Sequence, residues 1–128
     1  MEATVIRFTT TLFDVTKEHP NEINPIYGES LLLWLAEKLK DHVVVPEPQT
    51  EDWGWYIEID WKGRRYMLGA SASDEENGAR EWVLQIVKHR SFKERLSGKE
   101  KLTELDECSA HIHRLLASEE AFSGVSID

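Results

Sequence analysis

Residues 51–61 read EDWGWYIEIDW and hold three of the five tryptophans of the chain. In a β-strand, alternate side chains point to the same face of the sheet. The odd-numbered positions of this stretch are all large and apolar, namely Trp53, Trp55, Ile57, Ile59 and Trp61. The even-numbered positions hold glycine, tyrosine and acidic residues. We therefore predict a strand with one strongly apolar face.

The apolar face of this strand has two interpretations. Three indoles represent several hundred Å² of apolar surface, at roughly 150–250 Å² per buried aromatic side chain. Leaving that surface in water would forfeit several kcal/mol at about 25 cal/mol/Å². We predict that the face is a wall of the core beneath helices, with a stacking platform for sugars or bases as the alternative. Trp53, at the strand end beside Glu51 and Asp52, is the position where exposure is most expected.

A second strand, residues 64–72, follows after Lys62-Gly63. A two-residue turn would place Trp55 opposite Ala70, so that a large side chain faces a small one. The same turn would place Asp60 beside Arg65 on the other face. A three-residue turn with a left-handed Gly63 is the alternative, because Asp60 suits the first position of a type I turn.

Three further segments have the alternation and β-branched content of strands. Residues 4–13 read TVIRFTTTLF, residues 42–45 read HVVV, and residues 80–88 read REWVLQIVK. The last is apolar on both faces, which predicts a central strand. Asn77-Gly78 predicts a hairpin turn before it. Residues 122–127 either add an edge strand or fray.

A stripe of leucines from Leu31 to Leu39 predicts the first helix. Asn24-Pro25 is a suitable start, because Asn can cap and Pro at the first helical position loses no hydrogen bond. Capping by Ser30 is the alternative. Gly28 would permit another segment to approach closely.

Ser91 and Glu94 fit a capping box that opens a second, short helix. Gly98 is expected to end this helix. Phe92 and Leu96, four residues apart, would anchor it to the core.

Thr103 and Asp106 resemble a cap for a last helix, whose apolar stripe is Leu105, Cys108, Ile112, Leu115 and Leu116. On this helix Cys108 and His111 lie on adjacent turns, whereas His113 points elsewhere. Zinc sites need three or four converging ligands, so we predict no metal and no cofactor. Cys108 is predicted to be a small core residue with a poorly reactive thiol.

The order of these elements is β-α-β-β-β-β-α with a possible C-terminal strand. It predicts an α+β fold, a two-layer sandwich in which a mainly antiparallel sheet of four to six strands packs against two main helices. The 128 residues are expected to form one domain, residues 1–128.

Composition indicates a cytoplasmic protein. The single cysteine excludes an internal disulfide framework and suits a reducing compartment. The N-terminus has no basic start or apolar core typical of a signal peptide. The longest wholly apolar run, residues 31–36, is far shorter than the ~20 residues that a membrane span needs, so no membrane association is expected.

The net charge of −9 is unevenly distributed. Residues 88–101 carry a net charge of +4, which leaves −13 for the rest of the chain. The acidic majority disfavours nucleic-acid binding, which depends on neutralising phosphates, and favours a basic protein partner. An anion or nucleic-acid contact in the basic segment is an alternative, through Arg90, Lys93, Arg95 and Lys99.

The chain has no P-loop, GxGxxG, HExxH, GxSxG or paired CxxC motif. Paired carboxylates occur at Glu58/Asp60 and Glu51/Asp52, and the first pair would lie about 7 Å apart on one sheet face. A small enzyme using these surface carboxylates is therefore an alternative hypothesis. A solvated face with an ion pair to Arg65 is the simpler interpretation, so an enzyme is less expected than a binding protein.

The leading hypothesis is a small acidic protein that acts by protein–protein contact, as a binding, regulatory or immunity-type inhibitor protein. If helices cover only the apolar face of the sheet, the other face is open to a partner. That face would present Tyr56, Glu58, Asp60, Arg65 and Met67. Tyr, Met and Arg are enriched at interfaces. Neither the oligomeric state nor the identity of a partner or substrate follows from the sequence.

Overall fold

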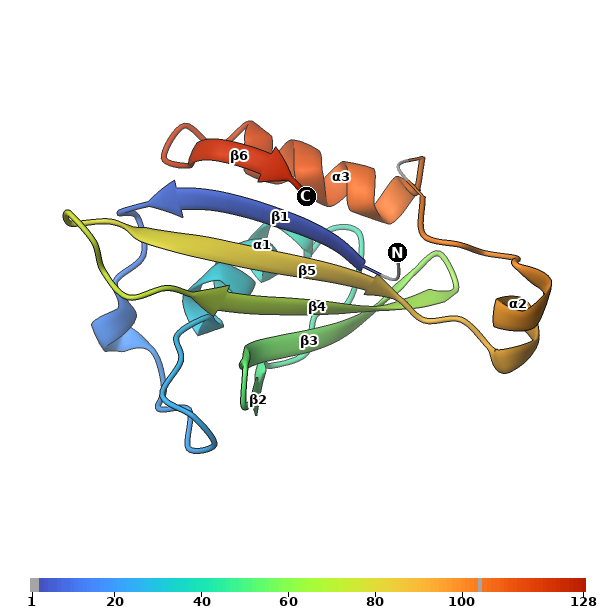
Figure 1. The fold of residues 1–128 in the computed structure, drawn as a ribbon, viewed down its shortest axis with the longest axis horizontal. Coiled ribbons are helices and arrows are strands. Elements are labelled where there is room, and N and C mark those ends of the chain that lie inside the picture. Colours follow the sequence, from blue (N-terminus) through green and yellow to red (C-terminus); the bar gives the residue numbers. More distant parts are fainter. Residues whose placement is uncertain (1–2, 104) are drawn as a thin grey trace.

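A computed structural model describes residues 3–103 and 105–128. It contains one six-stranded sheet in the order β2-β3-β4-β5-β1-β6, in which every neighbouring pair is antiparallel (Figure 1). The elements are β1 (Ala3–Thr10), a 3-10 turn η1 (Val15–Lys17), α1 (Glu29–Leu39), β2 (Gln49–Glu51), β3 (Gly54–Trp61), β4 (Arg64–Ala72), β5 (Arg80–Lys88), α2 (Phe92–Ser97), α3 (Glu107–Ala117) and β6 (Ser123–Ile127).

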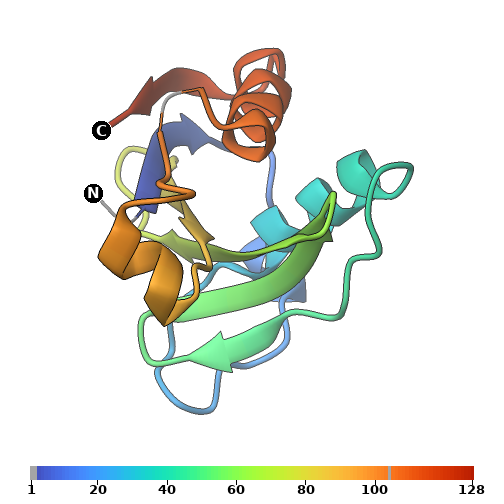
Figure 2. The same cartoon turned by 90° about the vertical axis from the view of Figure 1, so that its right-hand side faces the viewer.

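Helices α1 and α3 lie on the same side of the sheet, and together they form the second layer (Figure 2). The buried core lies between this layer and the sheet, with Leu31 and Leu35 from α1, Ile112 from α3 and Leu84 from β5 all fully buried. The predicted two-layer α+β fold is thereby confirmed. Helix α2 stands apart, beyond one end of the strands (Figure 1). In the described part of the chain, none of the helices is long and apolar enough to cross a membrane.

The hairpin between β3 and β4 has the two-residue turn. Trp55 pairs with Ala70 and Asp60 with Arg65. The turn residues Lys62 and Gly63 have φ angles of 50° and 85°. Positive φ at both central positions is the type I′ geometry that matches the twist of the flanking strands. Asn77 and Gly78, with φ of 54° and 82°, form the second predicted turn in the same way.

Two of the three tryptophans are in the core wall, and one is not. Trp55 and Trp61 are 3% and 7% exposed on the helix side of the sheet. Trp53, the position where exposure was most expected, is the exception, and only its assignment to the apolar face was wrong. It precedes β3 in the turn from β2 and packs over the opposite face. A Cβ added at Gly69 would lie 2.6 Å from Cη2 of Trp53. Gly54, with φ of 148°, breaks the alternation on which the prediction relied.

One predicted strand is absent, and one predicted strand boundary was wrong. Residues 42–45 are not a strand, and Val44 is 90% exposed. The edge of the sheet is instead β2, which begins after Pro46 and Pro48. Proline cannot donate to a strand ladder, so pairing starts only beyond it. Strand β1 ends at Thr10, whose hydroxyl accepts from the amide of Leu12 and turns the chain away.

At the C-terminus, the alternative of an added strand is the correct one. Strand β6 pairs antiparallel with β1, with Ile6 opposite Ile127. Phe122, just before β6, is 7% exposed and stacks on Phe8 of β1 at a ring-centroid distance of 4.3 Å. This contact anchors the edge strand to the core.

Neither predicted start of α1 is correct, because the helix begins at Glu29 after Gly28. The cap comes from ten residues upstream. The Glu18 carboxylate accepts from the backbone amides of Gly28, Glu29 and Ser30, at 3.1, 3.2 and 2.9 Å. A carboxylate there also complements the positive end of the helix dipole. Short-range capping patterns cannot reveal a cap from a distant loop.

We expect the Glu18→Ala variant to lose about 1–2 kcal/mol of unfolding free energy, because three amides at the start of α1 lose their acceptor. Urea denaturation followed by tryptophan fluorescence measures the change. Glu22→Ala, an exposed acid in the same loop, is the matched control and should be near neutral. Equal losses in the two variants would contradict the capping role.

Helix α2 has the predicted capping box at Ser91 and Glu94, and Gly98 ends it with φ of 72°. The predicted apolar anchor was wrong, since Phe92 and Leu96 are 77% and 74% exposed. The helix lies too far from the core for these side chains to reach it. Polar contacts hold it instead, as described below.

Helix α3 is capped by Asp106, whose carboxylate accepts from the Ser109 amide at 3.0 Å. Cys108, Ile112 and Leu116 are buried as predicted. Leu105 lies before the helix and is 88% exposed, so its place in the apolar stripe was wrong.

Candidate functional site

The face of the sheet opposite α1 and α3 is here called the outer face. The five side chains predicted as a partner surface all lie on it, because strand register places Asp60 beside Arg65 and Glu58 beside Met67. Tyr56 lies two residues before Glu58 on the same face. Glu58 and Arg65 form an ion pair at 3.5 Å. The structure therefore gathers these residues into one patch.

Three residues that were not predicted complete the centre of this patch. Trp53 covers Gly69, and the Sδ atom of Met67 lies 3.4 Å from the position of a Cβ at Gly69. Strand register places Val87 beside Met67 and Val83 beside Ser71, and Gln85 lies between the two valines, opposite Gly69. The side chains of Trp53, Met67, Val83 and Val87 are half-exposed. The valines could have been found from the predicted β4–β5 pairing, but Trp53 could not.

Charged side chains surround this apolar centre. They are Arg7, Glu58, Asp60, Arg65 and Glu81, so acids outnumber bases three to two. Arg7 of β1 bridges to Glu81 at 3.4 Å and to Asp128 at 2.5 Å. The outer face thus has a mostly apolar middle, interrupted by Gln85, and a charged, net acidic rim.

The first pair of carboxylates considered for acid–base chemistry, Glu58 and Asp60, lies on this open face. Glu58 contacts Arg65 and lies 3.8 Å from the ring of His89. Asp60 accepts from the Gly63 amide at 2.9 Å and so supports the hairpin turn. The second pair, Glu51 and Asp52, lies at the β2–β3 turn. General acid–base chemistry needs carboxyls in distinct environments within a cleft, and these contacts are those of a solvated surface.

The four basic residues predicted as an anion site are spread around α2. The Arg90 guanidinium donates to the carbonyls of Lys99 and Glu94, at 3.1 and 3.2 Å. Lys93 and Arg95 are exposed and two residues apart on the helix, so they point to different sides. The structure does not bring the four cations to one point.

Cys108, His111 and His113 face three different surroundings. Cys108 is fully buried, and burial raises the pKa of its thiol to about 12. His111 packs against His42, with ring centroids 4.7 Å apart. Burial is the main cause that lowers the pKa of His111, and the nearby His42 lowers it further. His113 faces a cavity described below.

A buried ionic cluster joins α3 and the segment around α2 to the end of the sheet. The carboxylate of Asp106, 8% exposed, accepts from the Tyr66 hydroxyl at 2.8 Å and lies 3.2 Å from Lys88 Nζ. Lys88 also pairs with Glu100 at 3.2 Å. Burial and the hydrogen bond to Asp106 raise the pKa of Tyr66. These groups satisfy one another, which indicates a structural role.

The neighbouring pair Arg64 and Glu94 is bidentate, with two hydrogen bonds of 2.8 Å. The pKa of Glu94 is lowered to about 2. The side-chain hydrogen bonds from Arg64 are the largest cause, and the hydrogen bond from the Ser91 backbone amide is the next. This pair attaches α2 to β4.

The buried side chain of Glu29 contacts His19. Its carboxylate accepts from the His19 amide at 2.8 Å and lies 2.9 Å from the His19 ring nitrogen Nδ1. The His19 side chain is 81% exposed beside a hollow that includes Trp55 and Glu47. With Glu18 capping α1, these contacts fix the loop before the helix.

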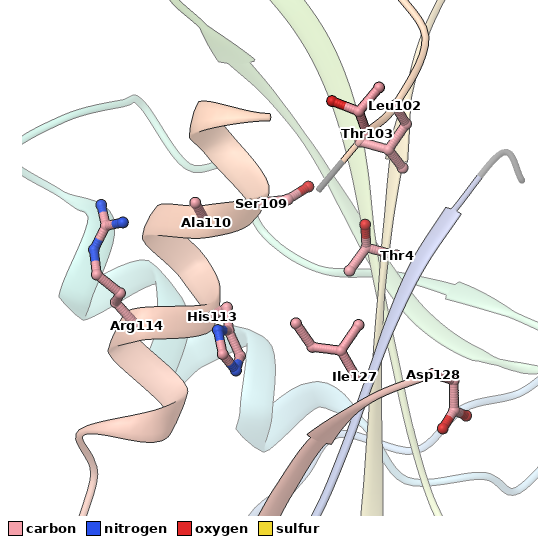
Figure 3. Close-up of a pocket in the computed structure, with 9 residues that line it drawn as sticks. All are labelled: Thr4, Leu102, Thr103, Ser109, Ala110, His113, Arg114, Ile127 and Asp128. Carbon is pink, nitrogen blue, oxygen red and sulfur yellow. The ribbon is translucent and has the colours of Figure 1, made fainter. Parts of the chain in front are cut away.

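The first turns of α3 border a cavity of about 380 Å³, here called the α3 cavity (Figure 3). Its wall is formed by Thr4, Leu102, Thr103, Ser109, Ala110, His113, Arg114, Ile127 and Asp128. Ser109 is 6% exposed, and its hydroxyl has no hydrogen-bond partner within residues 3–103 and 105–128. Sequence reasoning missed this cavity because its residues come from distant segments and are individually unremarkable in type.

Comparison of the chain with protein-family models, with curated proteins and with solved structures finds no match in any of the three.

Proposed function

We propose that this protein is a small binding protein that acts through the outer face of its sheet, with a basic protein as partner. The observation that carries the proposal is the uncovered sheet face on which Trp53 lies over Gly69 beside Met67. A regulatory or inhibitory role in the cytoplasm fits the single buried thiol, Cys108, and the acidic charge.

The side chains of the patch suit an interface. Aromatic residues, Met and Arg are enriched at interfaces, and an apolar centre within a polar rim is their usual anatomy. The patch lies on paired strands, so little conformational freedom is lost when a partner binds. The net charge of −13 outside residues 88–101 would attract a basic partner and speed the encounter.

The test places a photo-cross-linking amino acid at Tyr56 on the outer face, with Ala117 on α3 as the exposed control position. In cells, the Tyr56 variant should give a specific adduct with a basic protein, identified by mass spectrometry. The Ala117 variant should not give it. Adducts that are the same at both positions would contradict the proposal.

We expect Met67→Glu to weaken binding of the purified partner at least tenfold, because it places a charge in the apolar centre. Isothermal titration calorimetry measures the affinity. Lys93→Glu on α2 introduces the same side chain away from the patch and should leave the affinity within about twofold. An unchanged affinity in Met67→Glu would remove the outer face as the binding surface.

A further inference from the structure

We propose that the α3 cavity binds a small neutral molecule with an apolar body and one hydroxyl or amide head group. The cavity lies on the helix side of the sheet, away from the outer face. A test of this cavity therefore does not depend on whether the outer face binds a protein.

The uncharged side chains of the cavity wall that can form hydrogen bonds are Ser109, His113, Thr4 and Thr103. Ser109 and His113 come from α3, and Thr4 comes from β1 (Figure 3). The Ser109 hydroxyl points away from its helix toward the side where Thr4 and Thr103 lie. A buried hydroxyl without a partner is costly, and among the described residues it has none. A ligand that supplies the missing hydrogen bond gains that free energy on binding.

Apolar side chains form most of the rest of the wall, which also includes Arg114 and Asp128. Leu102, Ala110 and Ile127 border the same space, and Ile127 is 51% exposed at its edge. Small-molecule sites are clefts of roughly 300–1,000 Å³ with mostly apolar walls and a few convergent polar groups. The α3 cavity, at about 380 Å³, belongs at the lower end of that range. It fits a molecule with one apolar body.

The charges around the cavity favour a neutral ligand. Asp128 is paired with Arg7, and the buried carboxylate of Asp106 is paired with Lys88. The guanidinium of Arg114 points away from the cavity, on the far side of α3 (Figure 3). A charged ligand would therefore lose hydration without gaining an opposite charge. A ligand hydroxyl, in contrast, can both donate to and accept from Ser109, His113 and Thr4.

The test uses benzyl alcohol as the probe, with benzoate as the charged molecule of the same body. Two-dimensional ¹H–¹⁵N NMR should show saturable shifts with benzyl alcohol at Ser109, Ala110, His113 and Ile127. Benzoate should bind at least tenfold more weakly. Absence of saturable shifts at these amides would overturn the proposal. It would show that the α3 cavity does not bind the probe and that only water reaches the Ser109 hydroxyl. Equal binding of benzoate would overturn the assignment of a neutral ligand.

Two variants test the cavity itself. Ala110→Leu fills the space and should abolish the saturable shifts, whereas Ala117→Leu, exposed at the other end of α3, should leave them unchanged. Ser109→Ala should weaken benzyl alcohol binding about fivefold, as expected for one lost hydrogen bond. Thermal unfolding of each variant verifies that it is folded. Retained binding in Ala110→Leu, or unchanged affinity in Ser109→Ala, would overturn the proposed mode of binding.

Discussion

Replacing Asp106 by alanine is expected to lower the free energy of unfolding by about 3 kcal/mol. The carboxylate caps α3 through the Ser109 amide, accepts from the buried Tyr66 hydroxyl and pairs with Lys88. Removing one partner of a buried ion pair costs about 3–5 kcal/mol. The lower end applies, because Lys88 keeps Glu100 at 3.2 Å. Urea denaturation, with fluorescence as the signal, measures the loss.

Glu107→Ala is the matched control, since Glu107 is the next residue and is exposed. It removes a surface ion pair to Lys62 and an acidic group in the first turn of α3, each worth less than about 1 kcal/mol. If both variants lose the same stability, the buried cluster does not act as described.

The acid dependence of stability follows from the same carboxylate. Burial alone would raise the pKa of Asp106, but hydrogen bonds from the Ser109 amide, Tyr66 and Lys88 outweigh it and hold the pKa below its ordinary value of 3.8. A depressed carboxyl pKa stabilises the folded state above the unfolded-state pKa. This contribution should be fully present above about pH 5 and disappear as the pH falls through the folded-state pKa. Asp106→Ala should therefore flatten the acid limb of the stability curve.

Gly28→Ala is expected to lower the free energy of unfolding by about 2–3 kcal/mol. A Cβ at this position would lie 2.3 Å from the carbonyl oxygen of Ala70 in β4. The obstacle is backbone, which cannot rotate aside, so α1 must move away from the sheet. The predicted loss follows from this collision.

Gly63→Ala provides the comparison, because nothing lies within 4 Å of a Cβ there while φ is 85°. Its expected loss is about 1 kcal/mol, from the left-handed backbone alone. Guanidinium denaturation of both variants separates collision from backbone strain. A smaller loss for Gly28→Ala than for Gly63→Ala would show that α1 does not need this close contact.

Regular alternation is the reason that much of the fold could be predicted. The bounds of β5, the two-residue turns and the buried faces of β3 and β4 follow from period-two patterning and from local turn chemistry. Gly28 was correctly predicted as a point of close approach. These features depend on residues near one another in sequence.

Some of the errors involve contacts between distant segments, and others involve local backbone geometry. Glu18 caps α1 from another loop, and a single glycine, Gly54, sends Trp53 to the outer face. Phe92 and Leu96 have the spacing of a core anchor, yet α2 never reaches the core. The α3 cavity likewise depends on how α3 lies against β1 and β6, which no local pattern specifies.

We expect the polar attachment of α2 to make this helix a separate unit of local unfolding. The sheet, α1 and α3 share one apolar core, whereas α2 is held through Arg64 and Glu94 and buries none of its own side chains. Segments with few buried apolar contacts open locally at a lower free energy than the whole molecule. Helix α2 is therefore expected to detach and re-form while the rest of the domain stays native.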